Sequence, residues 1–247
     1  MFLDSAINQT FRLASSVVEL RQYTLKPNRR ETLIALFDRE FVETQEATGM
    51  TVIGQFRDLD RPDMFVWLRG FEDMAARRRA LTAFYEGPVW AAHKDAANAT
   101  MIDSDDVLLL RPAWADAGFN LTGLQRPAIA APGKASNENP LPGFVEISIH
   151  HLRRGAEAGF VEAFRREAAA RLAAHGARLL GAFTTEHAEN TFPRLPVRVD
   201  ENVFITVSRF DDEAAHARHG SAPDAWPYLA KPTQTLRLAP TSRSLLR

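Results

Sequence analysis

The chain carries Gly49-Met50-Thr51-Val52-Ile53-Gly54-Gln55-Phe56 and, 127 residues later, the related Gly176-Ala177-Arg178-Leu179-Leu180-Gly181-Ala182-Phe183. Two further pairs recur at the same spacing: Phe37-Asp38-Arg39-Glu40 with Phe164-Arg165-Arg166-Glu167, and Val18-Glu19-Leu20 with Val145-Glu146-Ile147. A repeat of this length is a whole domain, because solenoid units are only about 20–50 residues long. The chain is therefore predicted to contain two copies of one small fold.

Each copy is predicted to run strand, helix, strand, strand, helix, strand. Residues 17–25 alternate and are rich in β-forming residues, which is typical of a strand. Gly49 is expected to end the helix that follows, because glycine tolerates the left-handed cap. Further strands are expected at residues 50–56, 64–71 and 107–111. This βαββαβ order indicates a ferredoxin-like unit, an antiparallel sheet with helices on one face.

The second copy repeats this order with different connection lengths. Its strands are expected at residues 144–152, 178–184, 203–210 and 236–240. The hairpin between Thr185 and Asn202 has gained about 12 residues. The predicted division is a leader at 1–16, a first domain at 17–112, a proline-rich linker at 113–142, a second domain at 143–240 and a tail at 241–247.

The open face of each sheet must be covered. Two such units in one chain can cover each other, which predicts an α+β fold of two tandem ferredoxin-like domains whose sheets face across a central cavity. In the alternative, each half pairs with a second chain. Association into a homo-oligomer is also plausible, since ferredoxin-like sheets have edges that can pair.

Composition limits the function only broadly. The chain has 247 residues, 45% hydrophobic and 25% charged, as in ordinary globular proteins. A net charge of −1 predicts no attraction to nucleic acid or to anionic membranes. The chain has no cysteine, which excludes disulfides and thiolate metal sites. We find neither a signal peptide nor an apolar run long enough to span a bilayer, so a cytoplasmic location is expected.

Several segments of the first copy stand out in order: Glu19-Leu20-Arg21-Gln22-Tyr23-Thr24-Leu25-Lys26-Pro27, Gly54-Gln55-Phe56-Arg57-Asp58-Leu59, Phe65-Val66-Trp67-Leu68-Arg69-Gly70-Phe71, Arg77-Arg78-Arg79, Phe84-Tyr85 and Pro88-Val89-Trp90 to His93. This ordered set resembles the NIPSNAP family of the dimeric α/β-barrel superfamily, here in a tandem two-copy form. The second copy departs from the signature, with Glu146-Ile147-Ser148-Ile149-His150, and Asn28 stands where the family usually has glycine.

The resemblance implies two ferredoxin-like folds paired into an α/β barrel, but it implies little chemistry. Relatives in the superfamily include cofactor-free monooxygenases, haem-binding or haem-degrading enzymes and lactone isomerases, and function does not transfer with a fold. No cofactor is therefore expected. Haem, with His150 or His93 as its axial ligand, is the less favoured alternative.

Strand alternation predicts which side chains share a face. We expect the aliphatic faces to meet the helices and the mixed faces to line the cavity between the sheets. The mixed face of the first copy carries Glu19, Arg21, Tyr23, Trp67 and Arg69, and the register of the repeat adds Glu146, Ser148, His150, Thr206 and Ser208 from the second copy.

A cavity lined in this way predicts a small-molecule site. The predicted ligand-binding residues are Arg21, Tyr23, Trp67 and Arg69, and the predicted catalytic residues are Glu19, Glu146 and His150. His150 is favoured for proton transfer because a free histidine titrates near neutrality. The reaction would be oxygenation without a cofactor, or isomerisation.

The same residues also have a purely structural interpretation. Glu19 would form a cross-strand ion pair with Arg69 or Arg21, and the aromatic side chains would fill space. The protein would then be a non-catalytic scaffold or adaptor with a filled barrel. An open cavity beside Trp67, Arg69 and His150 would distinguish the two interpretations.

Neither the remaining histidines nor the arginine triplet predicts a site. His216 and His219 are three residues apart and have no third ligand nearby in the sequence, so no metal site is predicted. Arg77-Arg78-Arg79 falls on a predicted helix, where successive side chains point about 100° apart. A solvated helix face is therefore expected for the triplet.

Overall fold

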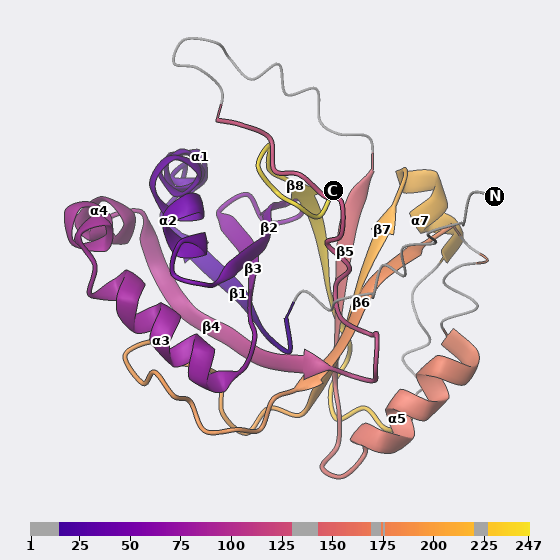
Figure 1. The fold of residues 1–247 in the computed structure, drawn as a ribbon. Coiled ribbons are helices and arrows are strands. Elements are labelled where there is room, and N and C mark those ends of the chain that lie inside the picture. Colours follow the sequence, from indigo (N-terminus) through magenta and orange to yellow (C-terminus); the bar gives the residue numbers. More distant parts are fainter. Residues whose placement is uncertain (1–14, 130–142, 169–173, 175, 220–226) are drawn as a thin grey trace, which may run out of the picture.

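The computed structural model describes residues 15–129, 143–168, 174, 176–219 and 227–247. Within them, eight antiparallel strands close into one barrel (Figure 1). Around the barrel the strands follow the order β1 (Val17–Leu25), β3 (Met64–Phe71), β2 (Thr51–Asp58), β8 (Gln234–Pro240), β5 (Phe144–His151), β7 (Val203–Phe210), β6 (Arg178–Thr185) and β4 (Met101–Pro112). Most of the predicted leader (1–14) and the second part of the linker (130–142) lie outside the described residues.

The barrel is assembled from two halves with the same order of elements. The helical segments of the first half are α1 (Arg30–Leu36), η1 (Phe37–Phe41), α2 (Val42–Glu46), α3 (Met74–Tyr85) and α4 (Pro88–Asn98). Those of the second half are α5 (Glu157–Ala163), η2 (Phe164–Ala168) and α7 (Glu213–His219). In each half the first strand lies between the third and the fourth. The halves join where β2 pairs with β8 and β4 with β6, so the predicted pair of ferredoxin-like units is confirmed and closes within one chain.

The repeated stretch builds the same local structure in both halves. Gly49 and Gly176 precede β2 and β6 with φ angles of 95° and 81°, a left-handed conformation that favours glycine. Each strand then contains a bulge, because its register shifts just before Gly54 or Gly181. A Cβ atom at Gly54 would lie only 2.5 Å from the ring of Phe56. The glycine thus leaves room for that ring to fold back into the barrel.

Apolar side chains fill the interior of the barrel, and all eight strands contribute to it. They are joined by Phe119 from the segment after β4 and by Leu246 from the C-terminal tail. The strand residues of this core are Val18, Leu20, Ile53, Phe56, Val66, Leu68, Leu108, Leu110, Val145, Ile147, Ile149, Phe183, Val203, Ile205, Val207, Leu236 and Leu238.

The predicted facing of the strands is therefore wrong. The aliphatic faces point into the barrel, whereas the mixed faces, with Glu19, Arg21 and Arg69, lie beneath the outer helices. The reason is geometric, because the inward side chains of a closed eight-stranded barrel converge in a space just wide enough for them. Charged groups would find neither water nor polar partners there, whereas the outer helices supply both hydrogen-bond donors and acceptors.

The helices form an outer layer, with α1 to α4 on one side of the barrel and α5 and α7 on the other (Figure 1). Residues 186–202, which join β6 to β7, are the predicted long hairpin connection and cross onto the first half. Glu186 N donates to Leu109 O and Arg198 N to Val107 O, both at 2.8 Å, so this segment runs along β4. Phe192 is buried in the core between the first sheet and its helices. No helix in the described residues has the length and apolar character needed to cross a membrane.

Candidate functional site

Four charged side chains meet beneath the helices of the first half, and we call Glu19, Arg21, Arg69 and Arg77 the Glu19 cluster. Glu19 on β1 lies opposite Arg69 on β3, Arg21 follows two residues along β1, and Arg77 reaches in from α3. Glu19 accepts hydrogen bonds from Arg21 Nη1 (2.7 Å), Arg69 Nε (2.8 Å) and Arg77 Nε (2.6 Å). Each of the four residues is at most 1% exposed.

The charges of this cluster fix its protonation states. Burial alone would raise the pKa of Glu19, but attraction to the three arginines outweighs it and holds the pKa well below its ordinary value. Burial alone would lower the pKa of Arg21, but its interactions with Tyr23 and Glu19 outweigh this and raise the pKa. Three guanidinium groups therefore share one carboxylate inside the protein.

Tyr23 and Trp67 pack against these guanidinium groups. Arg21 Nε donates to Tyr23 Oη at 3.0 Å, and the guanidinium carbons of Arg21 and Arg69 lie 5.6 and 5.1 Å from the centroid of the Trp67 ring. Burial raises the pKa of Tyr23. The predicted ion pairs of Glu19 with Arg69 and Arg21 are confirmed. The prediction that these residues line a cavity between the sheets is wrong, because they lie between the sheet and the helices.

The second half keeps the carboxylate of this arrangement but not its arginines. Glu146 lies opposite Ser208, as Glu19 lies opposite Arg69, and Ser148 takes the place of Arg21. Glu146 accepts from Ser148 Oγ at 2.9 Å, and its other oxygen lies 2.6 Å from His216 Nε2 on α7. His216 thus contacts Glu146 from a helix of this half, as Arg77 contacts Glu19 from a helix of the first half. The side chain of His219, the other half of the predicted histidine pair, lies outside the described residues.

His150 is buried against aromatic rings. The centroid of its ring lies 5.2 Å from that of Phe160 and 6.0 Å from that of Phe204, and its Nδ1 lies 3.0 Å from Thr233 Oγ1. Burial, helped by His151, lowers the pKa of His150 to about 4. The pKa of His150 in the folded protein thus lies well below that of a free histidine, and its enclosed ring does not fit an axial ligand of haem.

The other histidine considered for haem, His93 on α4, lies 3.4 Å from Glu40 Oε2. This contact pairs one ring nitrogen of His93 with a carboxylate. No group of three metal-ligating side chains that could hold a metal ion occurs among the described residues.

A groove of about 1100 Å³ opens between residues 186–202, the end of β5 and the start of α5, and we call it the hairpin groove. Two histidine–carboxylate pairs line it: His151 Nδ1 lies 3.3 Å from Glu201 Oε2, and His187 Nε2 lies 3.3 Å from Glu157 Oε2. Each of these carboxylates also accepts a hydrogen bond from an arginine. Arg198 donates to Glu201, and Arg111 Nη2 donates to Glu157 Oε1 at 2.9 Å.

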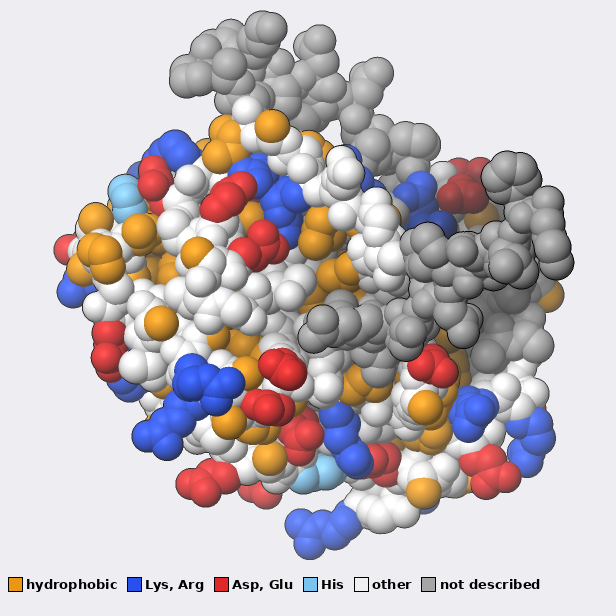
Figure 2. All heavy atoms as spheres, viewed as in Figure 1, with side chains coloured by type: hydrophobic (Ala, Val, Ile, Leu, Met, Phe, Trp, Pro, Cys, Tyr) orange, Lys and Arg blue, Asp and Glu red, His pale blue; other side chains and the backbone are white. Residues whose placement is uncertain are grey.

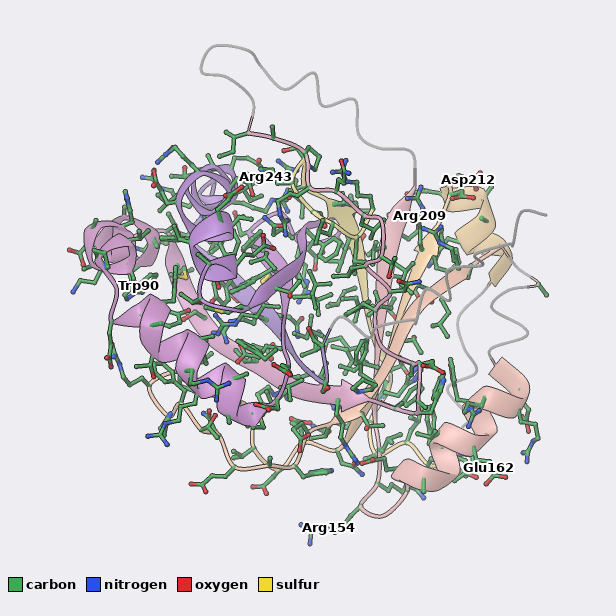
Figure 3. The ribbon with its side chains drawn as sticks, in the orientation of Figure 1. Trp90, Arg154, Glu162, Arg209, Asp212 and Arg243 are labelled. Carbon is green, nitrogen blue, oxygen red and sulfur yellow. The ribbon has the colours of Figure 1, made fainter. Side chains whose placement is uncertain are left out.

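The hairpin groove has a deep end and an open rim. The side chain of His151 is 11% exposed and that of His187 is 58% exposed, so His151 belongs to the deep end. Arg154, which also lines the groove, projects from the lower edge of the molecule in Figure 3. Acidic, basic and histidine side chains are mixed along that edge in Figure 2. The groove is thus a polar feature, unlike the interior of the barrel.

Residues 18–115 match the family model described as NIPSNAP. This part of the chain is a NIPSNAP domain. It extends from β1 to just beyond β4 and contains every residue of the Glu19 cluster. A comparison with curated protein sequences found no significant match.

Solved structures share the fold over nearly the whole chain. A protein from Lactobacillus acidophilus NCFM described as a "putative monooxygenase" has a TM-score of 0.56 at 12% identity, covering 91% of this chain and 93% of its own. A protein of the same description from Fusobacterium nucleatum subsp. nucleatum ATCC 25586 has a TM-score of 0.55 at 9% identity, covering 91% of each chain. An anthrone oxidase-like protein has a TM-score of 0.54 at 11% identity, covering 93% and 94%. At these identities the similarity shows the fold alone, in which the NIPSNAP domain and the second half together form the barrel.

The prediction of a solvated arginine triplet in the NIPSNAP domain is wrong for Arg77. Its two neighbours Arg78 and Arg79 are exposed, but Arg77 is fully buried and bonds Glu19. Helical spacing contained the signal, because Arg77 shares the buried face of α3 with Leu81 and Phe84. The groove residues had a weaker signal, namely the extra length of the hairpin, because inserted loops often carry function.

Proposed function

We propose that this NIPSNAP-domain protein binds a small polar molecule in the hairpin groove and transfers protons to or from it. The observation that carries the proposal is the chain of contacts from Arg198 through Glu201 to His151 on the groove wall. A carboxylate bound to one ring nitrogen orients an imidazole, which leaves the other nitrogen for the substrate. His187 and Glu157 repeat the arrangement nearer the rim.

The charges along the groove favour a neutral or cationic ligand. Five acidic side chains line it against three basic ones: Glu157, Glu186, Glu189, Asp200 and Glu201 against Arg154, Arg198 and Lys231. Proton removal is the first step of many isomerisations, and it also precedes oxygenation at an acidic C–H bond. Both expected reaction classes are therefore compatible with the two histidines.

A thermal-shift screen of neutral and cationic polar metabolites, followed by calorimetry on the compounds that stabilise the protein, tests the binding. We expect His151→Gln to weaken a bound compound by roughly tenfold or more, because a buried hydrogen bond to the ligand is lost. His93→Gln is the matched control, since His93 also pairs with a glutamate but lies outside the groove. Failure of every compound, or equal affinity in both variants, contradicts the proposal.

Proton transfer has its own test. For a compound that binds, exchange of its acidic C–H for deuterium in D₂O is followed by NMR. His151→Gln is expected to slow the exchange by about 10²-fold or more, the usual contribution of a general base. If a compound binds but its C–H does not exchange, the protein binds the compound without transferring protons, and the catalytic part of the proposal is contradicted.

The filled interior of the barrel favours a second candidate, a non-catalytic scaffold. The barrel core is apolar, and the predicted ligand-binding residues are buried between the sheet and the helices. In that case the thermal-shift screen should find no ligand, and His151→Gln should bind the same compounds as the wild type, if any bind.

A further inference from the structure

The Glu19 cluster holds more positive than negative charge. Its three arginines face one carboxylate, and their other hydrogen-bond acceptors among the described residues are uncharged: Tyr23 Oη, Gln45 Oε1, the Met50 sulfur, Tyr85 Oη, the Ser104 carbonyl, Asn190 Oδ1 and Thr191 Oγ1. Buried charge is strongly unfavourable unless a group of opposite sign pairs with it. Two guanidinium charges therefore remain without a counter-ion in this part of the protein.

Two hydrogen-bond donors of this region are also unused. Arg77 Nη2 and Trp67 Nε1 find no acceptor among the residues that the structure describes, although both residues are at most 1% exposed. Nearly all buried donors in folded proteins are satisfied, so an unsatisfied guanidinium nitrogen beside surplus positive charge points to an absent acceptor. Oxygen atoms that carry negative charge would supply both the acceptor and the counter-charge.

A short turn from the second half separates the cluster from the hairpin groove. Arg77 Nη1 donates to Asn190 Oδ1 at 2.9 Å and to Thr191 Oγ1 at 3.4 Å, and Thr191 Oγ1 donates to Met74 O at 3.1 Å. The ring of Phe192 anchors the turn 6.0 Å from that of Tyr85. Asn190 also lines the groove, so this residue faces the cluster on one side and the groove on the other.

We propose that the Glu19 cluster is a binding site for the carboxylate of a small organic acid, which reaches Arg77 from the groove by displacing Asn190 and Thr191. Arg77 provides the first contact, and Arg69 and Arg21 provide the remaining positive charge. The rings of Trp67, Tyr23 and Tyr85 beside these arginines favour an acid with an aromatic or unsaturated body. This site differs in place and in ligand charge from the one proposed in the groove.

Benzoate and its uncharged analogue benzamide are suitable probes. Calorimetry in a buffer without other carboxylates is expected to show saturable binding of benzoate and none of benzamide. Arg77→Gln should weaken benzoate by roughly tenfold or more, the effect of removing a charge-assisted hydrogen bond. Arg78→Gln, which removes the same charge from the exposed neighbour on α3, should leave the affinity unchanged.

Asn190→Asp keeps the test decisive if the Arg77 variant does not fold. The aspartate has the same shape as asparagine and places a carboxylate against Arg77, although it loses the hydrogen bond that Asn190 Nδ2 donates to Leu195 O at 2.9 Å. We expect this variant to lose benzoate binding, because its own carboxylate occupies the site. His151→Gln should bind benzoate normally, which separates this site from the groove.

Two outcomes would overturn the proposal. In the first, wild-type protein responds to benzoate as it does to benzamide, which would make the cluster a structural feature only. In the second, benzoate binds the Asn190→Asp variant as tightly as the wild type, which would place the carboxylate elsewhere.

Discussion

His150 and Tyr23 occupy corresponding places on β5 and β1, yet their surroundings differ. Tyr23 accepts a hydrogen bond from Arg21, whereas the residue that replaces Arg21 beside His150 is Ser148. His150 instead lies against two phenylalanine rings and has no carboxylate within bonding distance among the described residues. Its charged form would lose hydration without gaining a partner, which is why its pKa falls to about 4.

This shift predicts how stability depends on pH. An unfolded histidine titrates near 6.5 and His150 in the folded protein near 4, so the unfolded state binds more protons between these values. Stability should therefore fall as the pH drops from 6.5 to 4, with His150 contributing roughly 3 kcal/mol at most. Urea unfolding at several pH values should show a shallower fall for His150→Gln than for the wild type.

His93→Gln serves as the comparison for that experiment, since the side chain of His93 is 31% exposed. It should keep the slope of the wild type. If His150→Gln also keeps it, the imidazole is not shielded from water as the structure has it.

At the scale of elements, glycine and asparagine set the backbone at the turns and bulges. Asn28 has a φ angle of 63°. Asparagine tolerates this left-handed conformation better than most residues. In β2 and β6 the bulge glycines instead make room for the rings of Phe56 and Phe183.

Gly54→Ala should therefore destabilise the protein through a clash inside the barrel. Its Cβ atom would lie 2.5 Å from the Phe56 ring, which has little freedom to move in a filled core. We expect a loss of about 1–3 kcal/mol in the free energy of unfolding, as for other overpacked cores. Urea unfolding measures it.

A double-mutant cycle with Phe56→Leu checks the mechanism. If the ring causes the clash, the double variant should be more stable than the sum of the single effects predicts. Additive effects would mean that the cost arises in the backbone rather than at the ring.

At the scale of the whole molecule, segments distant in sequence hold the two halves together. The strand pairs β2–β8 and β4–β6 close the barrel, residues 186–202 run along β4, and the C-terminal tail returns to β2. Leu246 N donates to Ile53 O at 3.2 Å, and the Leu246 side chain joins the barrel core. The tail is thus part of the packing of both halves.

Leu246→Ala is expected to lower the free energy of unfolding by about 2–5 kcal/mol, the range for removing a buried leucine. Leu245→Ala, which shortens the partly exposed neighbour, should have a smaller effect. Urea unfolding should remain a single transition in both variants because the halves share one core. Two separate transitions, or equal losses, would contradict this account.

The sequence by itself determined the two-copy architecture, the βαββαβ order and the glycine turns, because strand alternation, helical spacing and left-handed glycines are properties of neighbouring residues. It showed that the two faces of each strand differ, but only barrel closure decided which face points inward, since both faces are buried. The sequence likewise could not place Arg77 against Glu19, 58 residues away, or join His151 to Glu201 in a groove. Such contacts depend on how the two halves pack against one another, and patterns among neighbouring residues do not predict that packing.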